Sequence, residues 1–196
     1  HISPEKISYI PNYIDTELFK PLNTIKENRI CYIGRLVERK NILNLIKAVS
    51  GLGLELVIFG SGPQKKDLED FSRRLNINAE FRGNIPNKDL LEELKKSKLF
   101  ILPSLYEGCP KVLLEAMACG LPVIGTNVEG IKEIIKHKEN GYLCETDVAS
   151  IRAAIIEVLN NKKIKEKIKF NARKTILQNF SLEKILEKEI NIYETL

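Results

Sequence analysis

The chain has 196 residues, of which 43% are apolar and 29% are charged, and its formal net charge is +5. These proportions are typical of a globular protein and exclude an intrinsically disordered chain. No apolar run approaches the roughly 20 residues of a membrane-spanning helix, and the N-terminal stretch HISPEKISYI lacks the apolar region of a signal peptide. Because the first residue is not Met and Ser3-Pro4 leads directly into a strand-like run, we expect a piece of a longer chain.

Short apolar runs alternate along the chain with longer segments whose apolar residues recur at helical spacing. The runs are rich in Ile, Val, Leu and Phe, as is typical of parallel strands that are covered on both faces. They predict strands at residues 29–34, 54–60, 79–83, 99–103 and 122–125, with a weaker strand at 141–144. The expected helices between them are residues 41–50, 63–75, 87–97, 110–118 and 130–136. After residue 146, three consecutive helices are expected at 147–160, 162–178 and 182–195, the last with Ser181 as its N-cap.

This alternation of strands and helices predicts βαβ units with right-handed crossovers. The expected fold class is therefore α/β, a doubly wound, Rossmann-like parallel sheet with helices on both faces and extra C-terminal helices. A ligand site in such a sheet lies at the carboxyl ends of the strands. Residues 11–21 (PNYIDTELFKP) are rich in turn formers and are expected to connect into the domain.

The cysteines do not form a recognisable metal site. None of Cys31, Cys109, Cys119 and Cys144 belongs to a C-x-x-C pair, and the chain has only two histidines. We therefore expect no metal, free thiols that are buried at positions 31 and 119, and a reducing, cytoplasmic compartment. The small excess of basic residues fits an anionic ligand without requiring nucleic acid.

Two of the strand-end loops combine glycine with cations or turn residues. In GRLVERK, residues 34–40, Gly34 would allow a ligand close to the backbone, and Arg35 and Lys40 place two cations at a helix start. This combination suits a diphosphate, and it also fits a solvated surface. The loop Gly60-Ser61-Gly62-Pro63 is no G-x-G-x-x-G fingerprint, because residue 65 is Lys. It fits either close backbone approach of a ligand or a tight turn with Pro63 at the first helical position.

The loop PSLYEGCPKVLLE, residues 103–115, carries the most informative pattern. Turn residues lead into a helix whose first amides have no partner within the helix, which is an anion site. Glu107 precedes this helix and Glu115 stands on the order of 7–8 Å along it, too far apart to share a proton. The two carboxylates suit the hydroxyl groups at two ends of one ligand, with a phosphate between them. The alternative is a capping Glu107 and a surface Glu115, but the helix around Glu115 is apolar, and burying an unpaired charge is costly.

The motifs GRLVERK, GSGP, FRGNI, PSLYEGCPKVLLEAMACGLPVI and NGYLC, in this order, resemble the donor-binding half of retaining glycosyltransferases of family 4. The resemblance covers nearly the whole chain, and its specific element is the glutamate pair followed by EAMA-x-G-x-PVI. It implies the C-terminal half of a GT-B fold, which has two Rossmann-like domains. Residues 1–25 would then be an interdomain segment, residues 26–180 the nucleotide-sugar-binding domain, and residues 181–196 a helix that crosses to an N-terminal domain absent from this chain.

The resemblance also implies a role for each loop. Arg35, Lys40 and Glu107 are the catalytic candidates, because the two cations would hold the diphosphate and Glu107 would contact hydroxyl groups of the donor sugar. Glu115 would bind the ribose, and the backbone of residues 83–85 would contact the base. The full set of expected nucleotide-sugar contacts besides the catalytic candidates is Gly34, Gly60, Gly62, Gly83, Asn84, Ile85, Gly108, Cys109, Pro110, Lys111, Val112, Leu113 and Glu115.

The activity that the resemblance implies belongs to a full-length hexosyltransferase in glycan synthesis. It would transfer a sugar from a UDP- or GDP-linked donor to an acceptor hydroxyl with retention, and it would need no metal or other cofactor. The present chain alone would bind nucleotide weakly and transfer nothing.

Two other classes of function stay open. A sugar-nucleotide epimerase or a phosphorylase shares the two-Rossmann architecture. A non-catalytic nucleotide-binding module would use the basic stretch 160–174 (NNKKIKEKIKFNARK) on a membrane surface or on nucleic acid. The same stretch also fits a solvated helix face, because residues 164, 168, 172 and 176 form an apolar stripe at helical spacing. Of the two partners we expect no nucleic acid, and we leave peripheral membrane contact open.

Overall fold

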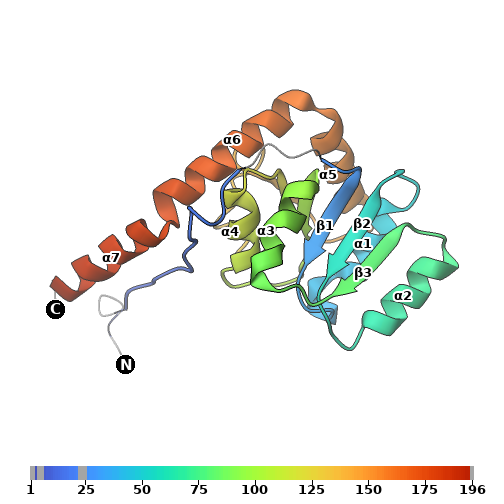
Figure 1. The fold of residues 1–196 in the computed structure, drawn as a ribbon, viewed down its shortest axis with the longest axis horizontal. Helices are drawn as coiled ribbons and strands as arrows, with labels where there is room; N and C mark the ends of the chain where they lie inside the picture. Colours follow the sequence, from blue (N-terminus) through green and yellow to red (C-terminus); the bar gives the residue numbers. More distant parts are fainter. Residues whose placement is uncertain (1–2, 4–6, 22–25, 195–196) are drawn as a thin grey trace.

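The chain folds around one sheet of six parallel strands in the order β3-β2-β1-β4-β5-β6. Figure 1 shows β1, β2 and β3 side by side. The computed structural model describes residue 3, residues 7–21 and residues 26–194, without the side chains of residues 87 and 88. The strands are β1 (Arg29–Ile33), β2 (Glu55–Phe59), β3 (Ala79–Gly83), β4 (Leu99–Leu102), β5 (Val123–Thr126) and β6 (Tyr142–Cys144). The predicted doubly wound sheet is confirmed, and the order reverses between β1 and β4, which is where ligands bind in sheets of this class.

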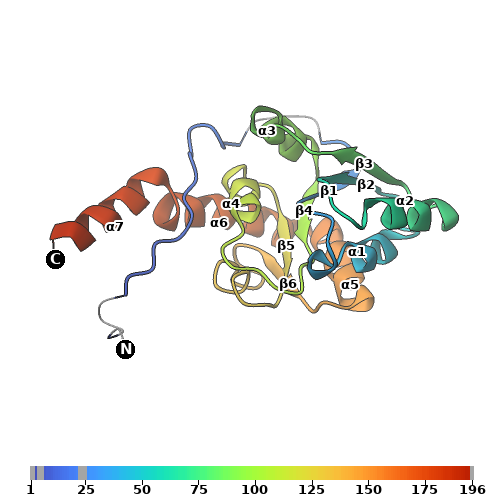
Figure 2. The same ribbon diagram turned by 90° about the horizontal axis from the view of Figure 1, so that it is seen from below.

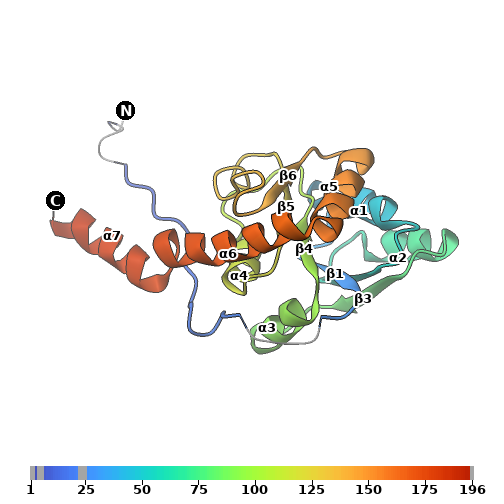
Figure 3. The same ribbon diagram turned by 90° about the horizontal axis from the view of Figure 1, so that it is seen from above.

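Helices cover both faces of the sheet. Helices α3 and α4 lie on one face, and α1 and α5 lie on the other (Figures 2 and 3). The helices are α1 (Ile42–Val49), α2 (Lys65–Arg74), α3 (Asn87–Lys96), α4 (Lys111–Ala118), α5 (Val148–Asn160), α6 (Lys162–Asn179) and α7 (Leu182–Glu194). A short 3₁₀ turn, Glu38–Lys40, precedes α1. None of the helices in the described ranges is long and apolar enough to span a bilayer.

The strands at the centre of the sheet are buried on both faces, as their apolar sequences predict. All four residues of β4 and all four of β5 are buried. Arg29 at the start of β1 is the exception to the apolar pattern, and it is only 1% exposed. Its guanidinium pairs with Glu93 at 2.7 Å and with Glu27 at 3.1 Å, so the buried charge is compensated.

Two expectations about the helices were wrong. Residues 130–136 form successive turns rather than a helix, because Gly130 has φ +74° and the Asn140 side chain accepts the Lys136 amide at 2.7 Å. The three isoleucines of this segment are buried, so their helical spacing reflects packing against the sheet. Pro63 does not occupy the first helical position either, since it lies in a turn and α2 begins at Lys65.

The C-terminal helices follow the expected pattern. Residues Ile168, Ala172 and Ile176 of α6 form the predicted buried stripe. The Lys184 amide donates to Ser181 Oγ at 3.3 Å, which confirms Ser181 as a cap of α7. The predicted final helical position, residue 195, lies outside the described residues.

Helix α7 projects away from the sheet with the N-terminal segment running beside it (Figures 1–3). The Ile14 amide donates to the Phe180 carbonyl at 2.8 Å, and Lys188 Nζ donates to the Tyr9 carbonyl at 2.6 Å. Only Ile185 of the described α7 residues is buried, whereas Ile190 and Tyr193 are 53% and 76% exposed. Residues 7–14 and helix α7 thus lie together, with apolar side chains on their surface.

Candidate functional site

The parallel strands bring four sequence-predicted loops to one edge of the sheet, where their carboxyl ends meet. The loops follow β1, β2, β3 and β4. Asn41, at the end of the first loop, ties this edge together because its side-chain amide donates to the carbonyls of Pro103 at 3.0 Å and Thr146 at 2.8 Å. The Leu105 amide also donates to the Arg39 carbonyl at 2.8 Å. The loop after β1 and the loop after β4 are therefore in direct contact.

The glycines of the second loop are explained by contact with the first loop. A Cβ atom on Gly60 would lie 1.9 Å from the Gly34 carbonyl oxygen, and one on Gly62 would lie 2.3 Å from that of Leu36. The loops are also hydrogen-bonded, since the Leu36 amide donates to the Ser61 carbonyl at 2.9 Å. Backbone packing thus requires glycine at both positions. Whether Gly34, Gly60 and Gly62 also contact a ligand stays a prediction.

Glu107 is held in place by two donors from different loops. It is 6% exposed, and its Oε1 accepts the Ser104 hydroxyl at 2.6 Å and forms an ion pair with Lys40 Nζ. The Thr126 hydroxyl in turn donates to the Ser104 carbonyl, which fixes the start of the loop. Because both donors use Oε1, they leave Oε2 as the acceptor for a ligand. Glu107 does not cap α4, whose N-cap position is Pro110 without a side-chain cap.

The two predicted cations have different environments. The Lys40 side chain is only 12% exposed and is paired with Glu107. Arg35 is exposed, and within the described part of the chain its guanidinium makes no hydrogen bond or ion pair. The Arg35 backbone is fixed, because Tyr32 Oη donates to its carbonyl at 3.0 Å. Arg35 is therefore the cation free to meet an anion, whereas Lys40 already neutralises a carboxylate.

The start of helix α4 offers unused backbone donors. Intrahelical hydrogen bonds begin at the amides of Leu113 and Leu114, which both donate to the Pro110 carbonyl. In the ranges that the structure describes, no protein acceptor takes the amides of Gly108, Cys109, Lys111 and Val112. These four predicted contact residues therefore present N–H groups together at a helix N-terminus, where anions are favoured.

Glu115 is the least compensated charge of this region. It is 7% exposed and lies one turn into α4, among buried apolar residues of that helix. Burial raises the pKa of its carboxyl from 4.5 to about 7, and the positive charge of Lys111 only partly offsets this effect. No donor within the described residues hydrogen-bonds to its carboxylate. The alternative of a surface Glu115 is therefore wrong.

The remaining predicted contacts, residues 83–85, lie at the end of β3. Gly83 has φ +69° and its carbonyl accepts the Gly60 amide at 2.6 Å, so this loop also adjoins the second one. Asn84 is exposed and Ile85 packs on the core. Burial raises the pKa of Tyr9, which lies against Cys109 and links the N-terminal segment to the Glu107 loop.

Sequence reasoning missed several residues that build the site. Ser104, Thr126 and Asn41 act through contacts to loops distant in sequence, so spacing alone could not reveal them. The helix expected at 130–136 would include Gly130, yet a Cβ there would lie 1.7 Å from the Gly108 carbonyl oxygen. The absence of a side chain at Gly130 thus allows residues 127–131 to pack directly against the backbone of the loop that carries Glu107.

The comparisons with known proteins agree with this architecture. The sequence model described as "Glycosyl transferases group 1" matches residues 14–175. An uncharacterized glycosyltransferase of Methanocaldococcus jannaschii is 36% identical over 86% of this chain and 45% of its own length. The UDP-Gal:alpha-D-GlcNAc-diphosphoundecaprenol alpha-1,3-galactosyltransferase of Escherichia coli is 31% identical over 98% of this chain and 55% of its own.

Solved structures show the same fold. Sucrose-phosphate synthase from Thermosynechococcus elongatus superposes with a TM-score of 0.85 at 26% identity, covering 95% of this chain and 51% of that one. The chain therefore spans about half the length of the curated relatives and of this structure. From the length of the family match and the shared fold, the chain belongs to the group 1 glycosyl transferases.

Proposed function

We propose that this chain binds the nucleotide-sugar donor of a glycosyltransferase that transfers a hexose with retention to an acceptor hydroxyl. Family membership supports sugar transfer, and the name of the Escherichia coli relative supports a UDP-linked donor. The family match also favours a transferase over an epimerase of similar architecture. The acceptor site and the remaining residues near the anomeric carbon would come from a second Rossmann-like domain.

The buried carboxylate of Glu115 is the observation that carries this proposal. A carboxylate that is 7% exposed and has no donor among the described residues is unfavourable by itself. Vicinal hydroxyl groups of a ribose would supply two donors to it and favour its charged form. Its place one turn into α4 puts it beside the free amides that would take the adjoining phosphate.

The other groups of the site suit the rest of a nucleotide sugar. Glu107 Oε2 would accept a hydroxyl of the donor sugar, while the pairing of Oε1 with Lys40 and Ser104 fixes its direction. Arg35 and the amides at the start of α4 would bind the diphosphate. As the bond between the anomeric carbon and the diphosphate oxygen breaks, these fixed positive groups would stabilise the charge that develops on the leaving group.

Lys40 has a more specific role in this scheme than that of a second diphosphate cation. Its ammonium group pairs with Glu107 inside the site and offsets the repulsion between this carboxylate and an anionic donor. We propose that it also faces the diphosphate once the donor is bound. No metal is needed in this arrangement, because fixed cations and amides provide the positive charge.

The proposal is tested by nucleotide binding with and without the ribose hydroxyl. Calorimetry with UDP, GDP and ADP first identifies the preferred diphosphate, and its 2′-deoxy analogue is then compared. The chain should prefer the ribonucleotide about tenfold or more, because a hydroxyl that donates to a charged group contributes about 1.5–3 kcal/mol. In Glu115→Ala this preference should vanish.

A matched control separates the ribose contact from general weakening. Arg35→Ala should weaken binding of the ribonucleotide and of its 2′-deoxy analogue by the same factor. If Glu115→Ala keeps the full preference for the ribonucleotide, the ribose role is wrong. If the chain binds none of the three diphosphates, donor binding by this chain is wrong. Sugar transfer by the chain alone would disprove the need for a second domain.

A further inference from the structure

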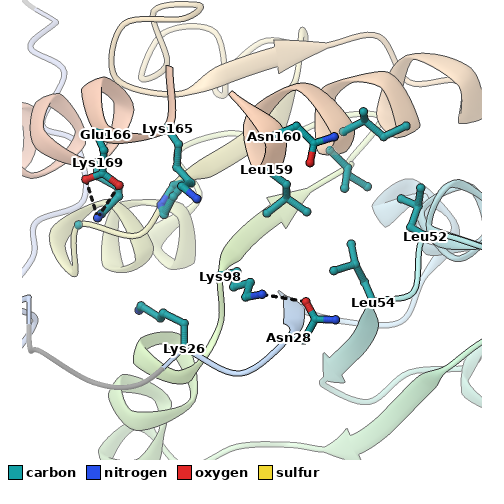
Figure 4. A pocket seen from close by; sticks show the side chains of 14 residues that line it. Lys26, Asn28, Leu52, Leu54, Lys98, Leu159, Asn160, Lys165, Glu166 and Lys169 are labelled. Atoms are coloured by element: carbon teal, nitrogen blue, oxygen red, sulfur yellow. Dashed lines mark hydrogen bonds and ion pairs between the residues drawn. The ribbon is translucent and has the colours of Figure 1, made fainter. Parts of the chain in front are cut away.

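A second cavity lies at the opposite edge of the sheet, where the strands begin. It has a volume of about 440 Å³, within the range of small-molecule sites. Its walls are the residues that precede β1, β2, β4 and β5 together with the facing sides of α5 and α6 (Figure 4). Since the proposed donor site occupies the carboxyl ends of the strands, the two sites do not share residues.

The lining of this cavity is apolar at one end and basic at the other. Leu52, Leu54 and Leu159 gather at one end in Figure 4. Lys26, Lys165 and Lys169 lie toward the other end, with Lys98 between the two groups. Glu166 is the one acidic residue among the described lining residues, so the cavity has an excess of three positive charges.

The positive charge is only partly compensated within the protein. Lys169 Nζ pairs with Glu166 at 2.8 Å, and Lys98 Nζ donates to Asn28 Oδ1 at 2.8 Å. Lys165 makes no side-chain hydrogen bond or ion pair in the described part of the chain. Burial lowers the pKa of Lys26, and the charges of Lys169 and Lys95 lower it as well, whereas Cys119 and Cys31 act in the opposite direction. Lys26 Nζ also donates to the Lys95 carbonyl. A bound anion would offset the remaining excess of positive charge.

We propose that this cavity binds a phosphate ester with an apolar chain. The phosphate would lie among the ammonium groups of Lys98, Lys165 and Lys169, and the chain would lie against the leucines at the other end. An inorganic anion would leave the apolar end empty, and a neutral apolar molecule would leave the lysines unpaired. The ester is either a free small molecule or the head group and upper chain of a membrane lipid.

The central experiment is calorimetric titration of the chain with hexyl phosphate. The double variant Lys165→Gln/Lys169→Gln, the cavity pair, removes two charges from the cavity. The double variant Lys163→Gln/Lys167→Gln, the control pair, removes two exposed charges at the same spacing on the same helix, outside the cavity. The cavity pair should weaken binding at least tenfold, because each ammonium group that pairs with the phosphate contributes strongly to affinity. The control pair should change it less than about threefold, since exposed charges act weakly through solvent. Equal weakening by the two pairs would disprove a specific site.

Chain length tests the apolar end of the cavity. Affinity should rise about fourfold for each methylene between methyl and butyl phosphate, the increment expected when a methylene is buried. Ile156→Gln, which changes a lining residue that is 40% exposed, should reduce the gain without affecting methyl phosphate. If inorganic phosphate binds as tightly as hexyl phosphate, the proposal is wrong.

Vesicles distinguish the two sources of the ligand. Co-sedimentation is measured with phosphatidylcholine vesicles that contain or lack phosphatidic acid. Binding that requires phosphatidic acid and is lost only in the cavity pair identifies a lipid, and binding of hexyl phosphate without vesicle binding identifies a free ester. Vesicle binding that both pairs reduce equally, or no binding of any phosphate ester, would overturn the proposal. The outcome does not depend on nucleotide binding, which the cavity pair should leave unchanged.

Discussion

Replacement of Glu115 by glutamine should stabilise the protein at alkaline pH. Burial raises the pKa of this carboxyl from 4.5 to about 7. A carboxyl whose pKa is higher in the folded state binds its proton more tightly there, so its contribution is fully favourable below pH 4.5 and is lost as the pH rises through 7. Glutamine has nearly the same shape and no charge to bury.

The size of this effect follows from the difference between the two pKa values. A difference of about 2.5 units corresponds to about 3 kcal/mol, since one unit is worth 1.36 kcal/mol. Because pH 5 already lies above the unfolded pKa, the free energy of unfolding of Glu115→Gln minus that of the wild type should increase by about 2.5 kcal/mol between pH 5 and pH 8. In a chain of this length, that is a relative gain of roughly 5–10 °C in Tm.

Urea unfolding followed by circular dichroism at several pH values between 5 and 8 measures this difference. Other titrating groups, including His137, whose pKa burial lowers, contribute equally to both proteins and cancel. Glu139→Gln changes an exposed carboxylate and should give a difference that is flat with pH. A flat difference for Glu115→Gln as well would mean that the Glu115 carboxyl is not held in an environment that penalises its charge, and the main reason to place a ligand there would be lost.

Four further predictions address the other parts of the site. Arg35→Ala should leave the free energy of unfolding within about 0.5 kcal/mol of the wild-type value, because Arg35 is exposed and its guanidinium has no partner among the described residues. In calorimetry the same variant should bind the preferred diphosphate about tenfold or more weakly, because it lacks the cation that would meet the ligand. Glu107→Gln should cost about 3 kcal/mol in urea unfolding because it leaves the nearly buried Lys40 without its counter-charge. Gly130→Ala should lower the free energy of unfolding by at least about 1 kcal/mol more than Gly53→Ala does in the same assay, since both glycines have positive φ but only a Cβ at residue 130 would clash with backbone. Equal losses of stability would refute the close contact between Gly130 and the Gly108 carbonyl. Nucleotide affinity should be the same with and without EDTA in calorimetry, and a loss on chelation would show that the site needs a metal.

The sequence predicted the sheet well because strand burial is encoded locally. The continuous apolar runs of β4 and β5 reflect burial on both faces, and this pattern needs no knowledge of the partner strands. The turn at 130–136 was mistaken for a helix because buried isoleucines at helical spacing occur in both structures. What decides between them is the positive φ of Gly130 and the Asn140 side chain, and both depend on contacts formed after folding.

For the site, the sequence located the loops but not the pairing between them. Glu107 and Lys40 were both predicted as functional, yet their ion pair joins residues 67 positions apart in the chain. Ser104 and Thr126 carry no pattern of their own, because their role is to hold another residue. Glu115 was the most predictable member, since a lone carboxylate in an apolar helix is unfavourable unless a ligand compensates its charge.

The two glutamates differ in how the protein compensates their charge, and this difference assigns them different tasks. Glu107 has a counter-charge and a hydroxyl donor on one oxygen, so it is paired and oriented before any ligand arrives. Glu115 has no hydrogen-bond donor among the described residues, and the positive charge of Lys111 offsets its burial only in part, so its charge is favourable only when a ligand supplies the donors. A ligand that supplies these donors should therefore favour the charged form of Glu115. Nucleotide binding should release a proton near pH 7, and this release should be absent in Glu115→Gln because the glutamine side chain has no proton to lose.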